Sequence, residues 1–135
     1  MKESLVVFDE VGRVIHYHLP DNRTAGAIPD SRDLWKIMEK HVEVLGGTAH
    51  THPSGFNRPS HEDVTTWSAT ELGLAKRFLW VIATKEKTTF WRWVGPGPYD
   101  YKGNHTPLPD MEWGLIGEAV DRLKALSGMY DEEDD

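Results

Sequence analysis

Two histidines separated by one residue, His50 and His52, are the side chains of this sequence whose types and spacing best predict chemistry. In an extended segment, residues i and i+2 point to the same face, so both imidazoles are directed towards one point. Zinc favours tetrahedral coordination by nitrogen, oxygen or sulfur, and a catalytic zinc site uses three protein ligands and one water. Asp63 can supply the third ligand. The sequence therefore predicts the site of a metal-dependent hydrolase.

The segment between the histidines and Asp63 is expected to turn the chain back towards them. Pro53, Gly55 and Pro59 interrupt regular structure, and Ser60 begins a pattern typical of a helix start. A second interpretation of Ser60 and Asp63 is a helix capping box, in which both side chains bond backbone N–H groups at the helix start. Taken alone, the pattern Ser-x-x-Asp favours the capping box.

The complete pattern is His-x-His, seven residues, Ser, two residues and Asp, and it resembles the motif of the JAMM (JAB/MPN+) zinc metalloprotease family, in a prokaryotic or phage form. The resemblance covers about residues 3 to 95. It implies that His50, His52 and Asp63 bind Zn²⁺ and that Ser60 helps to stabilise the tetrahedral intermediate. It also implies that a glutamate on the first strand is the general acid/base.

Glu3 and Glu10 are the candidates for that glutamate. Glu3 leads the apolar run that ends at Phe8, which resembles the glutamate-led strand of the family, whereas Glu10 lies in a turn before Gly12. Glu3 is therefore the predicted general acid/base. The alternative for Glu3 is a solvated carboxylate near a chain end, where order is usually poorest.

Length and composition favour one domain over residues 1–130, a JAB/MPN-type metalloprotease domain by the resemblance, followed by an acidic disordered tail over residues 131–135. The chain has 135 residues, of which 39% are hydrophobic, which is enough for a core. The net charge of −7 comes mostly from the tail, so the body lacks the basic surface expected of a nucleic-acid-binding protein. Cysteine is absent, so a metal site must use histidine and carboxylate.

No apolar run approaches the roughly 18 residues of a membrane span, and the start of the chain lacks a signal-peptide pattern. A cytoplasmic protein that does not enter the membrane is therefore expected. The sequence does not predict an oligomeric state.

The alternation of apolar patterns predicts an α/β fold, with a single layered domain in which helices flank a mixed β-sheet. The resemblance implies a JAB/MPN fold with a cytidine-deaminase-like sheet. The expected strands lie over 5–8, 14–19, part of 42–52, 78–84 and 89–94. The expected helices are one capped by Asp30 or Ser31 with Leu34, Ile37, Met38 and His41 on one side, one over about 60–76, and one capped by Asp110 with Leu115, Ile116, Ala119, Val120 and Leu123. The segment 99–109 is expected to be irregular and to border the substrate cleft.

Other conspicuous residues favour structural interpretations. His16 and His18 have the same spacing as the central pair but no following Ser-x-x-Asp, so they are expected to be solvent-facing histidines of a strand. Trp80 and the pair Trp91 and Trp93 are expected in the core.

The resemblance implies a peptidase or isopeptidase that acts at the C-terminus of a ubiquitin-like or small carrier protein. Two alternatives remain open. The details of the His-x-His-Pro-Ser-Gly segment also resemble RadC-type proteins associated with DNA metabolism, and a non-catalytic MPN-type binding scaffold is expected if Glu3 cannot reach the metal.

Overall fold

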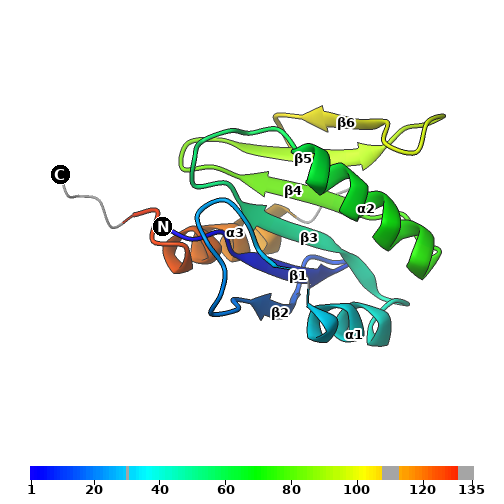
Figure 1. Ribbon diagram of the computed structural model, residues 1–135, viewed down its shortest axis with the longest axis horizontal. Coiled ribbons are helices and arrows are strands. Elements are labelled where there is room, and N and C mark those ends of the chain that lie inside the picture. The colour runs from blue at the N-terminus through cyan, green and yellow to red at the C-terminus, as the bar shows by residue number, and fades with distance from the viewer. Residues whose placement is uncertain (30, 108–112, 131–135) are drawn as a thin grey trace.

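Six strands form a mixed sheet in the order β2-β1-β3-β4-β5-β6 in the computed structural model, which describes residues 1–29, 31–107 and 113–130 (Figure 1). The strands are β1 (Leu5–Asp9), β2 (Val14–His18), β3 (Leu45–Thr51), β4 (Leu79–Ala83), β5 (Thr88–Trp93) and β6 (Tyr101–Asn104). β3 and β4 run parallel, and the other neighbouring strands are antiparallel. A parallel pair requires a crossover connection, which α2 (His61–Leu74) provides. The predicted α/β fold with a mixed sheet is confirmed.

Helices cover both faces of the sheet: α1 (Arg32–Lys40) and α2 lie on one face, and α3 (Trp113–Leu126) lies on the other (Figure 1). Each face has its own apolar core, because alternate residues of a strand point to opposite sides of the sheet. Val6 belongs to the same core cluster as Leu123 of α3, whereas Val7 belongs to the cluster that contains Met38 of α1 and Trp67 of α2. This alternation also decides which strand residues can reach the functional site.

Serine side chains set the starts of the first two helices. The hydroxyl of Ser31 accepts a hydrogen bond from the backbone N–H of Leu34 at 3.2 Å, which identifies Ser31 as the cap of α1. Ser60 caps α2 as predicted, and Ala75, whose φ of 56° is left-handed, caps its C-terminal end. The alternative cap Asp30, and the cap Asp110 predicted for α3, lie outside the described residues.

The prediction that segment 99–109 is irregular is wrong for its central part. Residues Tyr101–Asn104 form β6, which pairs with β5 from Phe90↔Asn104 to Trp93↔Tyr101. β6 is the edge strand of the sheet, with β4 and β5 between it and β3, and its residues do not line the cavity beside the candidate site. The strand was missed because its four residues, Tyr-Lys-Gly-Asn, contain one large apolar side chain.

Burial corrects three further expectations. His18 is only 7% exposed rather than solvent-facing, because it lies opposite Leu5 on the face that α1 and α2 cover. Leu115 is 42% exposed, at the edge of the buried stripe of α3 rather than within it. Trp93 is half-buried and lies outside the core clusters, whereas the half-buried Trp91 packs against the core and Trp80 lies in it, both as predicted.

A buried carboxylate, Glu71, fixes α2 to the sheet. Its oxygens accept hydrogen bonds from Arg77 Nη1 at 2.9 Å, the Phe78 backbone N–H at 3.0 Å, Trp80 Nε1 at 2.9 Å and the Tyr101 hydroxyl at 2.5 Å. Burial and the hydrogen bond to Glu71 raise the pKa of Tyr101 above its usual range. The helix that carries Asp63 is thereby fixed to β4 and β6.

Among the described residues, no helix combines the length and the apolar character needed to cross a membrane. The predicted tail over 131–135 lies outside the described residues, and the domain boundary at residue 130 stays a prediction.

Candidate metal centre

The register of β1 on β3 brings Glu3 to the two histidines. Leu5 pairs with His50, so the antiparallel register continued by two residues places Glu3 opposite His52. Side chains opposite each other share a face of the sheet, and residues two apart on one strand also share it. Ligand atoms of Glu3, His50 and His52 accordingly lie within 4.8 Å of one another.

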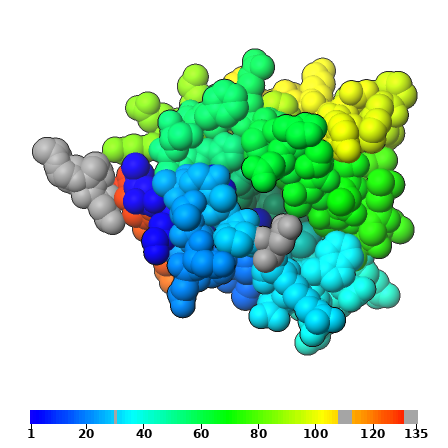
Figure 2. All heavy atoms as spheres, in the orientation of Figure 1, coloured from blue at the N-terminus to red at the C-terminus, as the bar shows by residue number. Residues whose placement is uncertain are grey.

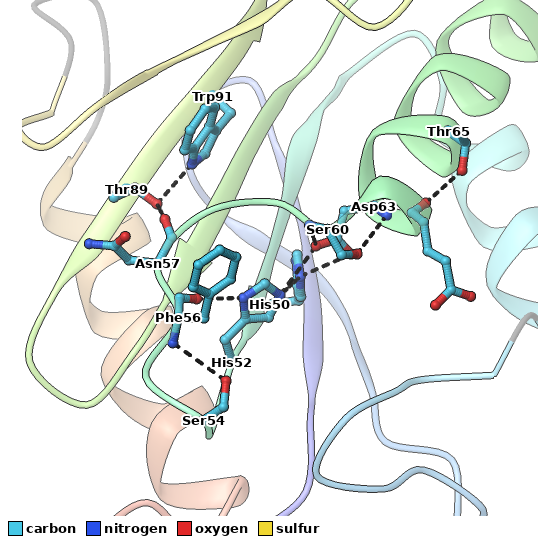
Figure 3. Close-up of polar contacts among 11 residues, drawn as sticks. His50, His52, Ser54, Phe56, Asn57, Ser60, Asp63, Thr65, Thr89 and Trp91 are labelled. Atoms are coloured by element: carbon cyan, nitrogen blue, oxygen red, sulfur yellow. Dashed lines mark hydrogen bonds and ion pairs between the residues drawn. The ribbon is translucent and has the colours of Figure 1, made fainter.

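The loop between His52 and Ser60 is fixed at several points (Figure 3). A turn closes with the hydrogen bond from Gly55 N–H to the His52 carbonyl at 3.0 Å, and the φ of 87° at Gly55 is a conformation that favours glycine. Further along, the Thr89 hydroxyl of β5 donates to the Asn57 carbonyl at 2.8 Å. The loop therefore returns the chain to the histidines in a defined shape.

Ser60 and Asp63 form the capping box, and Asp63 also faces the histidines. The Ser60 hydroxyl accepts a hydrogen bond from Asp63 N–H at 3.0 Å, and Asp63 Oδ2 accepts one from Ser60 N–H at 2.8 Å. At the same time Asp63 Oδ1 lies 3.5 Å from His50 Nε2, and Oδ2 lies 3.3 Å from His52 Nε2. The two interpretations of this pattern are thus compatible, because one carboxylate caps the helix and also faces the histidines.

The ionisation of the carboxylates reflects these contacts. Burial acts to raise the pKa of Asp63, but the hydrogen bonds with His50 and His52 outweigh it and hold that pKa well below its usual range. Burial raises the pKa of Glu3, against the opposing effect of the two histidines. Asp63 is therefore the more anionic of the two groups, which suits a metal ligand, whereas the raised pKa of Glu3 suits a group that exchanges protons.

Glu10, the other upstream candidate, lies at the far end of β1. Its carboxylate pairs with Lys76 Nζ at 3.0 Å. Asp9 and Leu45, at that end of the sheet, are paired, whereas the histidines lie at the opposite end of β3. Glu10 is thus remote from the histidines.

The donor set fits a zinc ion. His50 Nε2 and His52 Nε2 lie 2.8 Å apart. His52 Nδ1 lies 2.7 Å from the Phe56 carbonyl, and a proton donated there leaves Nε2 with its lone pair directed at the site. Two imidazole nitrogens and the Asp63 carboxylate would supply three ligands to such an ion, the usual number for a catalytic zinc.

A cavity of about 660 Å³ opens beside these residues, between α1, α2 and the segment 25–29. Figure 2 shows the hollow between the cyan and green helices. Its lining includes Glu3, His52 and Asp63 together with the apolar side chains of Trp35 and Trp67. This volume falls within the roughly 300–1,000 Å³ typical of ligand sites.

Hydrogen bonds to two other segments of the chain hold the backbone around Glu3 in place. Glu3 N–H donates to the Thr24 carbonyl at 2.7 Å, and Ser4 N–H donates to Thr51 Oγ1 at 2.9 Å. Glu3 is half-buried, so the alternative of a solvated, frayed carboxylate does not describe it. The position of Thr51 between the two histidines, which directs its side chain to the opposite face of the strand, is the sequence feature that could have indicated this contact.

Comparison with known proteins agrees with this geometry. Residues 4–94, more than half of the chain, match the family described as prokaryotic homologs of the JAB domain. A search of curated proteins found no match. The JAB family includes zinc metalloproteases, and together with the group formed by Glu3, His50 and His52 it indicates a metal ion. The chain therefore belongs to the prokaryotic JAB-domain family.

Proposed function

We propose that this protein is a zinc-dependent peptidase or isopeptidase that hydrolyses an amide bond at the C-terminus of a ubiquitin-like or small carrier protein. The observation that carries the proposal is the convergence of His50, His52 and Asp63 on one point, with the Glu3 carboxylate beside them. Zinc in such a site polarises a carbonyl oxygen and lowers the pKa of water towards neutrality.

The proton transfers fall to Glu3. A carboxylate with a raised pKa can take a proton from the attacking water and return it to the departing amine. Its backbone is held by neighbouring segments, so the carboxylate approaches the histidines from a fixed direction. Positioned proton transfer of this kind contributes roughly 10²–10⁴-fold to rate.

Ser60 is the proposed donor to the developing oxyanion. Its oxygen already accepts the hydrogen bond from Asp63 N–H, so the hydroxyl proton remains available for a substrate. Removing one such donor typically costs about 10²–10³-fold in kcat.

The cavity beside the metal centre is the proposed site for the substrate segment next to the scissile bond. Its aromatic and aliphatic walls can bury apolar side chains, and Phe56, which is 57% exposed, stands at its border. An extended C-terminal tail can enter this open hollow more readily than a folded surface can. This argument supports a flexible tail as the substrate.

The test combines zinc analysis with cleavage of ubiquitin-like proteins fused through their C-termini to a fluorescent amine. The wild-type protein should bind about one zinc per chain and cleave at least one fusion. Glu3→Gln should keep its zinc and lose roughly 10²-fold or more in kcat. Glu10→Gln is the matched control, because it alters a carboxylate at the far end of the same strand.

Other outcomes would favour the alternatives. Equal cleavage by wild type and Glu3→Gln would remove Glu3 as the general acid/base. Full zinc content without any cleavage would favour a binding scaffold, and salt-sensitive binding to DNA would favour the RadC-like alternative.

A further inference from the structure

A chain of buried hydrogen bonds leads from the end of α3 to the residue after Glu3. Ser127 Oγ lies 2.8 Å from Thr51 Oγ1, which in turn accepts the hydrogen bond from Ser4 N–H at 2.9 Å. Ser4 and Thr51 are fully buried, and Ser127 is 2% exposed. The Ser4 amide lies 47 residues from Thr51 in the sequence, and the two hydroxyls of Thr51 and Ser127 lie 76 residues apart.

The same segment is held by backbone contacts on both sides of Glu3. Lys2 N–H donates to the Ser127 carbonyl at 3.1 Å, and Thr51 N–H donates to the Ser4 carbonyl at 3.0 Å. Ser127 therefore holds the residue before Glu3, and Thr51 holds the residue after it while contacting the Ser127 hydroxyl.

The arrangement follows from the alternation of the strands. Glu3, His50 and His52 point to the face that α1 and α2 cover, whereas Ser4 and Thr51 point to the face that α3 covers. Side-chain contacts on the α3 face can thus fix the position of Glu3 from the side of the sheet opposite the two imidazoles and the cavity.

We propose that Thr51 and Ser127 are positioning residues that hold the Glu3 carboxylate at the metal centre. The inference rests on the proposed function, and it adds α3 to the parts of the chain that determine the rate. Ser127 lies outside the residues matched by the family model, so this support belongs to the chain's own C-terminal helix.

The positioning role predicts a specific kinetic pattern. A proton-transfer group must be held within about 0.5 Å of its productive place, and a displacement of about 1 Å can cost 10²-fold. Releasing Ser4 N–H from Thr51 shifts Glu3 only partly, because Thr24 still holds it. We therefore expect kcat to fall roughly 10-fold while KM and zinc content change little.

The experiment uses the full chain with Ser127→Ala, Thr51→Val and Thr51→Ser. Val matches the shape of Thr without its hydroxyl, and Ser restores the hydroxyl. Ser68→Ala, at another buried serine on α2, is the matched control for loss of a buried hydroxyl. The assays are kcat and KM on a cleaved fusion, zinc per chain, and hydrogen exchange of the Ser4 amide in metal-free protein.

Thr51→Val removes the acceptor of Ser4 N–H, and Ser127→Ala removes the hydroxyl that orients this acceptor, so both should lower kcat and speed exchange at Ser4. Thr51→Ser and Ser68→Ala should resemble wild type. Unchanged kcat in Ser127→Ala, or a Thr51→Ser variant as slow as Thr51→Val, overturns the proposal. If Thr51→Val does not fold, the Ser127→Ala result decides.

The two proposals fail separately. If the zinc-loaded wild type cleaves no fusion, the proposed function fails, and exchange at Ser4 in the metal-free variants still decides whether this segment is held by Thr51 and Ser127. Exchange equal to wild type in both variants then rejects the positioning role.

Discussion

Replacing Glu71 by glutamine changes the charge of a side chain whose carboxylate is only 1% exposed while nearly preserving its shape. Its two oxygens accept four hydrogen bonds, and glutamine keeps only one of the oxygens. The orientation that costs least turns the new NH₂ group towards Arg77 and Tyr101, because Arg77 is 48% exposed and can be hydrated. The bonds from Phe78 and Trp80 are then retained, but as weaker bonds to a neutral oxygen.

The magnitude follows from these contacts. A hydrogen bond to a charged group is worth about 1.5–3 kcal/mol, a neutral one about 1 kcal/mol, and an exposed ion pair less than about 1 kcal/mol. The Arg77 bond is lost, because guanidinium cannot accept from NH₂, and the Tyr101 bond becomes a neutral bond in which the phenol oxygen accepts. Together with the weaker bonds from Phe78 and Trp80, this should lower the free energy of unfolding by roughly 3 kcal/mol. For a chain of this size the midpoint temperature should fall by about 10 °C.

Urea unfolding with a metal chelator present measures this loss without a contribution from bound metal. Glu118→Gln, at an exposed position of α3, is the control and should change stability by less than about 0.5 kcal/mol. A loss below about 1 kcal/mol in Glu71→Gln would refute the reasoning, because it would mean that the four bonds contribute little beyond hydration.

Two further predictions concern the metal centre. In the metal-free protein, the pKa of Asp63 lies below its ordinary value of 3.8. The pKa of His52 lies above its ordinary value of 6.5, because contacts with Asp63 outweigh the opposing effect of burial on His52. The stability that Asp63 contributes should be lost as pH falls below 3.8, and the stability that His52 contributes should be lost as pH rises above 6.5. Asp63→Asn should remove both pH dependences from the urea midpoint. Midpoints that vary with pH in parallel for wild type and Asp63→Asn would contradict this. Gly55→Ala should lower the free energy of unfolding by about 1 kcal/mol, because the φ of 87° is left-handed although a Cβ there meets nothing within 4 Å. The substitution should also displace the Phe56 carbonyl and so weaken zinc binding in a competition assay. Unchanged affinity for zinc would show that this carbonyl does not orient His52.

The local part of the site could be predicted from the sequence. The spacing of His50 and His52 fixes their common face, and the Ser60 pattern fixes a helix start, since both depend on neighbours in the chain. Glu3 was selected by its strand context and the resemblance, and the β1–β3 register then places it beside the histidines.

Contacts between distant segments could not be predicted in this way. The sequence around Glu71 predicts only a helix, whereas the four partners of its carboxylate come from three other segments of the chain. The hydroxyls of Thr51 and Ser127 meet only because α3 packs beneath β3. Burial of His18 likewise depends on what covers β2, which strand patterning does not specify.

Because Leu5 pairs with His50, the spacing between Glu3 and β1 determines where the Glu3 carboxylate lies relative to the histidines. Inserting one residue there would turn Glu3 to the α3 face, and inserting two would restore the face but carry the carboxylate about 7 Å along the strand, away from His52. The turn between β1 and β2, at the other end of these strands, carries no such constraint. Insertions should therefore be tolerated in the turn between β1 and β2, whereas insertions between Glu3 and β1 should abolish the proposed catalysis. A short tag should for this reason not be inserted within the first five residues.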